Sequence, residues 1–140
     1  MAEFNFIPVG LRVIQVEQTA LDNLRPYIDA RFQKACELML ACKGRIVVIG
    51  MGKSGHIGNK IAATLASTGT PAFFVHPGEA SHGDLGMITP QDVVIAISNS
   101  GETGEVLAIV PLIKRMHAPL ISITNNVHST LSQAATVSLE

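Results

Sequence analysis

The sequence has no excess of charge of either sign. Its 10 Lys and Arg residues are balanced by 11 Asp and Glu residues, which gives a formal net charge of −1 over 140 residues without a basic stripe. Proteins that bind nucleic acids usually present clustered positive charge, because their target is a polyanion. The charge balance therefore predicts no nucleic-acid partner, and no segment of the sequence reads as a DNA-binding motif.

Long hydrophobic runs are also missing. Apolar stretches such as residues 46–49 are far shorter than the roughly 20 residues that a helix needs to span a bilayer. The first residues show neither the charged nor the apolar region of a signal peptide. We expect a cytoplasmic protein with no membrane contact.

Cysteine is scarce. Cys36 and Cys42 are the only two, and they lie six residues apart near the end of a predicted helix, where a disulfide is geometrically awkward. No second pair of Cys or His residues completes a zinc site. We expect two buried or half-buried thiols and no metal site.

The residues that are present describe one ordinary globular domain. Hydrophobic residues make up 47% of the chain and charged residues 15%, and 140 residues suffice for a sizeable core. So few surface charges leave room for buried contacts between subunits. An oligomer is therefore expected.

The N-terminal quarter differs from the rest. Residues 1–10 contain Pro8 and Gly10 and show no hydrophobic period, which predicts an irregular arm ahead of a domain over residues 11–140. Apolar residues at helical spacing then predict two helices, over residues 11–24 and 26–42.

From residue 45 onward, short β-branched runs alternate with helical stretches. Strands are predicted at residues 46–49, 72–75, 93–97, 120–124 and 136–139, and helices at residues 54–67 and 102–116. Continuous apolar strands separated by helices indicate a parallel sheet covered on both faces. The expected fold is a three-layer α/β/α sandwich with a mainly parallel, flavodoxin-like sheet, which binds ligands at the carboxyl ends of its strands. The last strand has no helix to cover it, so we expect the chain to stop inside its fold.

Three hydroxyls follow the third predicted strand, in the segment Ser-Asn-Ser-Gly-Glu-Thr of residues 98–103. The free N–H groups and the positive dipole end of a first helical turn attract an anion, and Gly101 lets the backbone approach it. The segment therefore favours phosphate binding through Ser98, Ser100 and Thr103. The alternative is a helix cap, a role that needs one hydroxyl, and of the three Thr103 is the first candidate for a purely structural role.

A glycine-rich segment, Gly-Met-Gly-Lys-Ser-Gly at residues 50–55, follows the first predicted strand and opens a helix. It matches the G-x-G-x-x-G of dinucleotide sites, so a nicotinamide-dependent oxidoreductase is an alternative. Against it, the second strand ends without an acidic residue for the ribose, and Lys53 projects a charge from the loop. We interpret the segment as a tight turn that presents Lys53 and Ser54 to the cleft. The competing interpretation is a purely structural turn with Lys53 solvated.

A third loop at the same edge spans residues 78–86 and is rich in glycine, histidine and carboxylates. His82 could act as acid, base or electrophile near neutral pH, or could only hydrogen-bond within the loop. His56 and His76 are weaker candidates, and Asp84 is expected to be a turn or cap residue.

Glu105 lies in the first turn of the helix predicted after the serine-rich segment. The helix dipole alone favours an acid there. A carboxylate one turn from a bound phosphate can also reach the carbon skeleton attached to it. Glu105 is therefore a candidate base, whereas Glu102 is expected to point elsewhere.

Four segments combine into a specific pattern: GMGKSGHIG at residues 50–58, HPGEA at 76–80, HGDLGM at 82–87 and ISNSGE at 97–102. Together they resemble the sugar isomerase (SIS) domain of D-arabinose 5-phosphate isomerases, over the chain from about residue 11 to its end. The resemblance implies interconversion of D-ribulose 5-phosphate and D-arabinose 5-phosphate, which feeds synthesis of the lipopolysaccharide acid Kdo. It implies no organic cofactor and no required metal.

Residue by residue, the resemblance implies phosphate contacts from Ser54, Ser98, Ser100 and Thr103. It implies active-site roles for Lys53, His82 and Glu105. A later glutamate and histidine of the family, and the tandem CBS domains of many members, have no counterpart in this chain. Activity of the shortened domain is therefore uncertain at this stage.

Isomerisation requires a base that moves a proton between C1 and C2 through an enediolate, and a positive group that stabilises the oxyanion. Glu105 is the candidate base, with the missing glutamate as its rival. Lys53 would stabilise the enediolate, and His82 would orient a hydroxyl or shuttle a proton. A homodimer or homotetramer is expected, with the N-terminal helices packed on a second subunit. The alternative function is a non-catalytic module that senses phosphosugars.

Overall fold

The protein is built on a five-stranded parallel sheet. The computed structural model describes residues 4–80 and 84–140. The strands are β1 (Ile46–Gly50), β2 (Ala72–Val75), β3 (Val93–Ile97), β4 (Leu120–Ile123) and β5 (Val137–Leu139). They lie in the order β2-β1-β3-β4-β5, and every neighbouring pair is parallel. This order is the flavodoxin-like one, so the predicted sheet is confirmed, with strand bounds that differ by no more than one residue.

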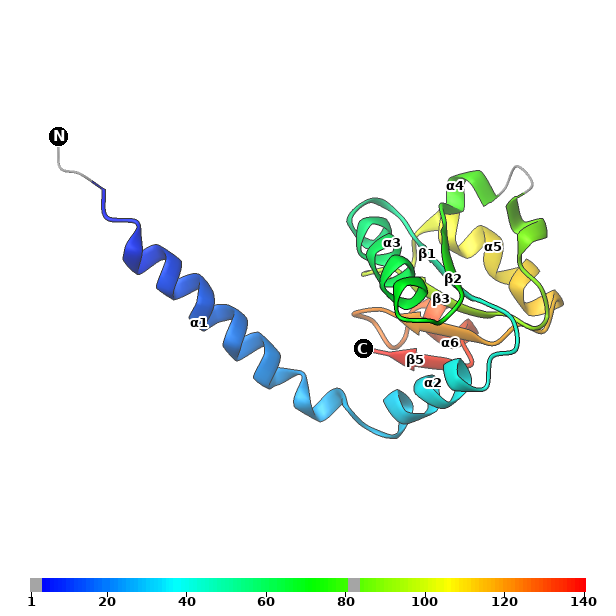
Figure 1. Cartoon of the computed structure of the whole chain (residues 1–140), viewed down its shortest axis with the longest axis horizontal. Helices are drawn as coiled ribbons and strands as arrows, with labels where there is room; N and C mark the ends of the chain where they lie inside the picture. The colour runs from blue at the N-terminus through cyan, green and yellow to red at the C-terminus, as the bar shows by residue number, and fades with distance from the viewer. Residues whose placement is uncertain (1–3, 81–83) are drawn as a thin grey trace.

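Helices cover both faces of the sheet (Figure 1). Along β1, Val47 and Ile49 face one core, with α5 (Gly104–Arg115) and α6 (Thr130–Ala134). Ile46 and Val48 face the other core, with α2 (Ala30–Leu40) and α3 (Gly52–Ser67). Every residue of β1 is buried, as a central strand between two apolar layers requires. The predicted three-layer α/β/α sandwich is therefore confirmed.

The helix α3 begins almost directly after β1, and α5 follows β3 after the six residues 98–103. In α5 the buried residues Val106, Ile109, Val110 and Ile113 recur at the i, i+3, i+4, i+7 spacing of one apolar face. The expected helices at 54–67 and 102–116 are thus present, with bounds shifted by one or two residues. A short helix, α4 (Pro77–Ala80), and a 3-10 turn, Asp84–Met87, lie between β2 and β3.

The N-terminal part differs from the expectation in two places. Residues 7–10 were expected to be irregular, yet α1 (Ile7–Asn23) begins at Ile7, because Pro8 occupies the first turn, where its missing N–H costs nothing. The helix expected at 26–42 is a short 3-10 turn, Arg25–Tyr27, followed by α2. The break occurs at Asp29, whose carboxylate accepts the N–H groups of Arg31 and Phe32 and so starts a new helix.

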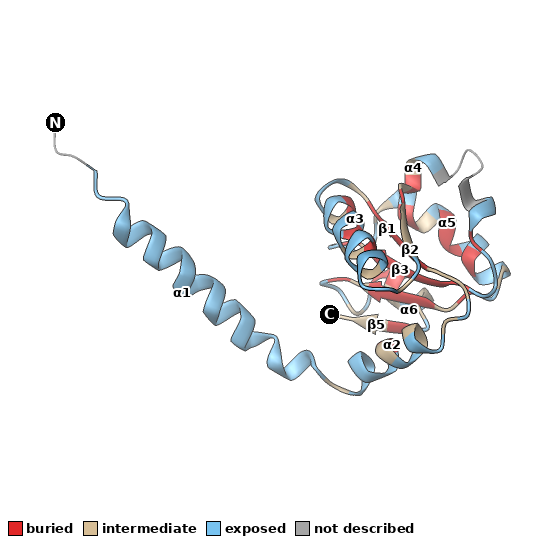
Figure 2. Ribbon diagram, viewed as in Figure 1, coloured by how far each residue is buried: buried red, intermediate tan, exposed pale blue. Residues whose placement is uncertain are grey.

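The helix α1 projects away from the sheet (Figure 1). None of its residues is buried, and Figure 2 shows it exposed along its whole length. Its exposed large apolar residues are Ile7, Val9, Leu11, Val13, Ile14, Val16 and Leu21. No helix in the described ranges is both long and apolar enough to cross a membrane.

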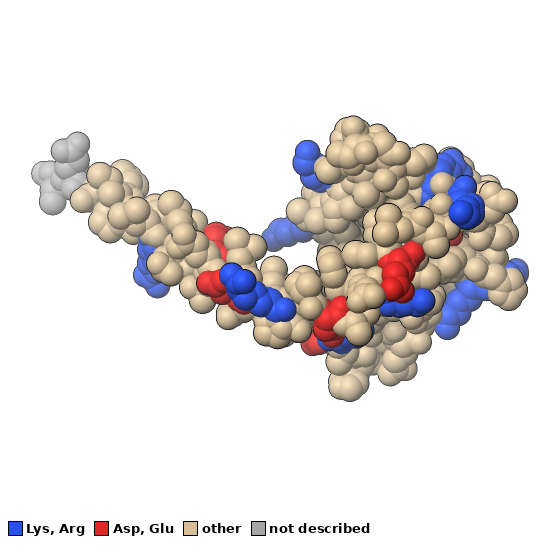
Figure 3. Space-filling model, turned by 60° about the horizontal axis from the view of Figure 1, so that its bottom comes forward, with Lys and Arg blue, Asp and Glu red and all other residues tan. Residues whose placement is uncertain are grey.

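Two smaller expectations concern thiols and charge. Cys36 and Cys42 are free and half-buried, as predicted. The Cys42 thiol donates to the carbonyl oxygen of Gln91 at 3.4 Å. On the face drawn in Figure 3, Lys and Arg are interspersed with Asp and Glu along the helical arm and the domain.

Candidate active site

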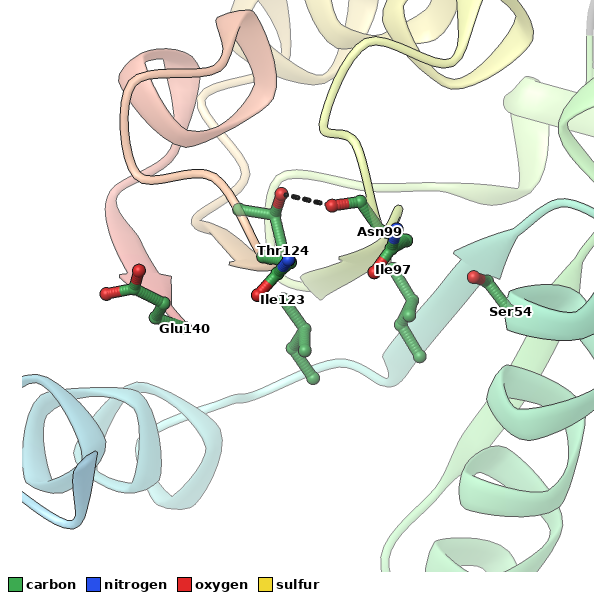
Figure 4. Close-up of a pocket in the computed structure, with 7 residues that line it drawn as sticks. Ser54, Ile97, Asn99, Ile123, Thr124 and Glu140 are labelled. Atoms are coloured by element: carbon green, nitrogen blue, oxygen red, sulfur yellow. Dashed lines mark hydrogen bonds between the residues drawn. The ribbon is translucent and has the colours of Figure 1, made fainter. Parts of the chain in front are cut away.

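Several strand ends converge on one cavity. It has a volume of about 260 Å³ and is drawn in Figure 4. Its lining residues are Ser54, Ile97, Asn99, Ile123, Thr124, Asn125 and Glu140. The chain leaves β1 toward β2 and then returns to the other side of β1 as β3, so the strand order reverses between β1 and β3. Ser54 and Asn99, which follow these two strands, flank this switch point, the usual ligand position in such sheets.

Residues 98–103, which we call the serine loop, join β3 to α5. The Ser98 side chain is buried, and its Oγ lies 2.8 Å from Thr103 Oγ1 and accepts the N–H of Gly101 at 3.1 Å. Ser100 is exposed, and its Oγ accepts the N–H of Glu102 at 3.1 Å. Ser98 thus shapes the loop from inside, while Ser100 lies on its surface.

Thr103 is the N-cap residue of α5, but its hydroxyl accepts no N–H of the helix. It is instead paired with Ser98. The Thr103 hydroxyl therefore does not cap α5, because a side-chain cap would satisfy one of the first N–H groups of the helix.

A row of backbone donors borders this loop. Within the part of the chain that the structure describes, the N–H groups of Asn99, Ser100, Thr103 and Gly104 have no hydrogen-bond acceptor. Thr103 and Gly104 lie at the N-terminus of a 12-residue helix, where the helix dipole is positive, and Asn99 and Ser100 precede them in the loop. Gly101 has φ of +68° and lets the backbone turn between them. The arrangement suits a phosphate or another multivalent oxyanion.

The glycine loop after β1 is explained by packing. Gly52 has φ of +53°, and a Cβ on Gly55 would lie 2.7 Å from the carbonyl oxygen of Gly50. The first, second and third glycines of the pattern therefore serve the close strand-to-helix turn. Ser54 is half-buried and lines the cavity, whereas Lys53 is exposed beside it.

Comparison with known proteins identifies the family, since the model of the SIS domain matches residues 39–140. The chain belongs to the SIS domain family. It is 60% identical over 136 residues to the arabinose 5-phosphate isomerase KdsD of Escherichia coli K12, and 61% identical over 136 residues to that of Pseudomonas aeruginosa PAO1. Each alignment covers 97% of this chain and 42% of the relative, so the chain spans about two fifths of these relatives' length.

A solved structure gives the same family assignment. The structure of an Escherichia coli CFT073 protein in complex with arabinose 5-phosphate superimposes with a TM-score of 0.83 at 45% identity, covering 98% of this chain and 74% of that one. The resemblance inferred from the four sequence segments is thereby confirmed, and so is the fold that it implied.

Of the predicted site residues of this SIS domain, some line or adjoin the cavity and others do not. Ser54 lines the cavity, and Ser98, Ser100 and Thr103 form the adjoining loop. Lys53 and Glu105 are both exposed, in the first turns of α3 and α5, and neither lines the cavity. His82 lies outside the described residues, and the Asp84 backbone begins a 3-10 turn.

Sequence reasoning missed four polar residues at the cavity: Asn99, Thr124, Asn125 and Glu140. The Asn99 carbonyl accepts the Asn125 N–H at 3.0 Å and the Thr124 hydroxyl at 3.3 Å, the contact drawn in Figure 4. Thr124 and Asn125 directly follow β4, which is the same signal that identified the serine loop after β3. The signal was available but was not applied to the fourth strand.

Proposed function

We propose that this SIS domain is the sugar-phosphate-binding part of an arabinose 5-phosphate isomerase. The observation that carries the proposal is the row of unpaired N–H groups at the serine loop, beside the cavity at the switch point. Identity of 60% to KdsD over 97% of the chain supports D-arabinose 5-phosphate as the ligand. We place the activity in the cytoplasm, because charged sugar phosphates do not cross a bilayer unaided.

The phosphate end is held away from the reaction. Donors from Asn99 and Ser100, with the hydroxyls of Ser100 and Thr103, would bind the phosphate oxygens, and Ser54 would contribute from the facing loop. Fixing the non-reacting end supplies binding energy that orients C1 and C2.

The reaction then moves one proton between two carbons. A base removes the C2 proton of D-arabinose 5-phosphate, and the electron pair forms the C1–C2 double bond of an enediolate. Return of a proton to C1 leaves the carbonyl at C2, which is D-ribulose 5-phosphate. We assign the base to Glu105, stabilisation of the enediolate to Lys53, and proton transfer between the two oxygens to His82. This chemistry requires neither a metal nor an organic cofactor.

Assembly into a homodimer or homotetramer completes the proposal. An isolated helix of about 15 residues is marginally stable in water, yet α1 has 17 residues and no buried side chain. At about 100° per residue, six of its seven charged or amide- or hydroxyl-bearing residues fall within one sector of about 140°, and Glu17 lies on the opposite side. The six are Arg12, Gln15, Gln18, Thr19, Asp22 and Asn23. Apart from Glu17, the rest of the helix surface is apolar and covers more than half of the circumference, which suits a groove between elements of a second copy.

Calorimetric titration tests the ligand. D-arabinose 5-phosphate is expected to bind the chain, whereas unphosphorylated D-arabinose and NAD are not. Equal binding of D-arabinose would contradict the phosphate site, and tight NAD binding would favour the dinucleotide interpretation.

Isomerisation is followed by NMR in D₂O, as exchange of the C2 proton of D-arabinose 5-phosphate. We expect Glu105→Gln to slow exchange by at least about 100-fold while affinity for the sugar phosphate stays within about threefold. Glu37→Gln, at an exposed glutamate of α2, is the matched control and should leave both unchanged. Near-normal exchange in Glu105→Gln would rule out Glu105 as the base. Binding without any exchange in the unmodified chain would favour a sensing module.

A further inference from the structure

The first turn of α6 is capped from the serine loop rather than only by its own flanking residues. The Thr130 N–H donates to Glu102 Oε1 at 2.7 Å, and the Leu131 N–H donates to the carbonyl oxygen of Gly101 at 3.1 Å. The next two N–H groups of α6 are accepted by Ser129, through its hydroxyl and its carbonyl. Two of the four N–H groups at this helix end are therefore satisfied by residues of the serine loop.

The serine loop also packs tightly against the β4–α6 loop, residues 124–129. The Asn99 carbonyl accepts two donors from this loop, those of Thr124 and Asn125. A Cβ on Gly101 would lie 2.1 Å from Ser129 Oγ, so only a glycine allows this approach. The two loops form one connected unit at the carboxyl edge of β3 and β4.

These contacts orient the donors of the proposed phosphate site. A peptide group is planar and trans, so the carbonyl of one residue and the N–H of the next point in opposite directions. Because the Asn99 carbonyl is held by the β4–α6 loop, the Ser100 N–H is directed away from that loop. The Gly101 carbonyl is held by Leu131 in the same way, and the following N–H, that of Glu102, donates to Ser100 Oγ.

Glu102 is the one carboxylate within the serine loop, and it would repel a phosphate if it faced the unpaired donors. Its Oε1 instead accepts the Thr130 N–H, on the side of α6. The backbone N–H of the same residue positions the Ser100 hydroxyl. Glu102 thus caps the first turn of α6 and orients the Ser100 hydroxyl, while its carboxylate is hydrogen-bonded to a backbone N–H.

We propose that Glu102 is a positioning residue for the sugar-phosphate site, in that its carboxylate ties the serine loop to α6 and holds the loop's N–H groups in their binding arrangement. The inference rests on the proposed function. Preorganised donors bind an anion more tightly, because the cost of ordering them is met during folding. The carboxylate acts through the loop and does not touch the ligand.

Two variants separate this role from a general effect on folding. Glu102→Ala removes the acceptor of Thr130, whereas Glu102→Gln keeps an oxygen there and removes the charge. Affinity for D-arabinose 5-phosphate is measured calorimetrically in the 140-residue chain, below the unfolding temperature of each variant. We expect Glu102→Ala to weaken binding about fivefold, as for loss of a helix cap, and Glu102→Gln to remain within about twofold of the unmodified chain. Glu37→Ala, an exposed glutamate of α2, is the control for loss of a carboxylate and should bind normally.

Amide hydrogen exchange provides a readout that needs no ligand. In Glu102→Ala, exchange at Thr130 and at the serine loop should accelerate, while the strands keep their protection. Equal affinity in all the variants, or lower thermal stability with unchanged affinity, would overturn the positioning role. Failure of the unmodified chain to bind the sugar phosphate would overturn the proposed function itself, whereas unchanged exchange at Thr130 would overturn only the assignment of Glu102.

Discussion

Gly101 is the residue on which the geometry of the serine loop depends most. Its φ of +68° lies in the left-handed region, and a Cβ there would lie 2.1 Å from Ser129 Oγ and 2.4 Å from Ser129 Cβ. Any other residue would have to accept both backbone strain and a collision with the β4–α6 loop.

Substitution of this glycine separates the two costs. Gly101→Ala is expected to lower the free energy of unfolding by more than about 2 kcal/mol, from strain of about 1–2 kcal/mol plus the collision, and to abolish binding of D-arabinose 5-phosphate. Gly69→Ala is the matched control, because Gly69 also has positive φ, +98°, but no atom lies within 4 Å of the added Cβ. It should lose about 1 kcal/mol and keep its affinity. Urea denaturation measures the free energy of unfolding of the two variants. Equal losses of unfolding free energy in Gly101→Ala and Gly69→Ala would show that the collision with Ser129 is relieved.

At the scale of elements, strands and helices with a regular apolar pattern were predictable from the sequence. The residues at which the N-terminal helices begin were not. The strands were found because each is a continuous β-branched run, and α5 because its apolar residues repeat at helical spacing. The predicted N-terminal bounds of α1 were wrong because a proline such as Pro8 can either break a helix or occupy its first turn. The local sequence is compatible with both. Asp29 likewise starts a helix only when its carboxylate reaches two N–H groups.

The candidate site was predictable in part for the same reason. The serine loop has three hydroxyls after a strand, a signal that depends only on local sequence. The contribution of Thr124 depends on β4 lying next to β3, which is a property of the sheet order. The direction of the Glu102 carboxylate depends on α6, 28 residues farther along the chain. Sequence patterns place a residue at an edge, but packing decides which neighbour it meets.

The start of α2 gives a pH prediction. The side-chain hydrogen bond from Arg31, together with the backbone N–H groups of Arg31 and Phe32, holds the pKa of Asp29 below its ordinary value, although desolvation opposes this. A carboxyl with a lowered pKa in the folded state stabilises the fold above its unfolded pKa and loses that contribution as the pH falls through the folded value. Protection of the Arg31 and Phe32 amides, taken as their exchange rate relative to that of an unstructured chain at the same pH, should therefore fall only below the usual pKa of an aspartate, about 3.9.

Substitution of the cap tests the same point. In Asp29→Asn the side-chain oxygen remains an acceptor without titrating, so the amide protection of α2 should lose its pH dependence. Asp29→Ala should expose both amides at every pH. Unchanged protection in Asp29→Ala would contradict the capping role.

At the scale of the whole molecule, the exposed helix α1 stands apart from the sheet domain. Its wide apolar surface is the strongest physical reason to expect a second copy, because water does not stabilise such a surface on an isolated helix.

Charge placed on that surface tests assembly. Ile14→Glu is expected to shift the mass measured by light scattering from a dimer or tetramer to the monomer, since a carboxylate would be buried without a partner. Gln15→Glu introduces the same charge one position away, in the polar sector, and should leave the mass unchanged. A monomeric unmodified chain would contradict this use of α1, and an assembly that tolerates Ile14→Glu would place the contact elsewhere.

The connected pair of loops has a consequence for how such a site diversifies. The described hydrogen bonds that join the serine loop to the β4–α6 loop and α6 all lie within one stretch of chain, residues 98–131. Lys53, to which we assign chemistry, comes from the earlier segment after β1, which shares none of those hydrogen bonds in the described structure. The part of the phosphate anchor formed by residues 98–131 therefore does not depend on Lys53, whereas Ser54 and Glu105 join phosphate binding to the chemistry in our proposal. Mutation can retune the region around Lys53 for another sugar while the hydrogen bonds within residues 98–131 stay intact.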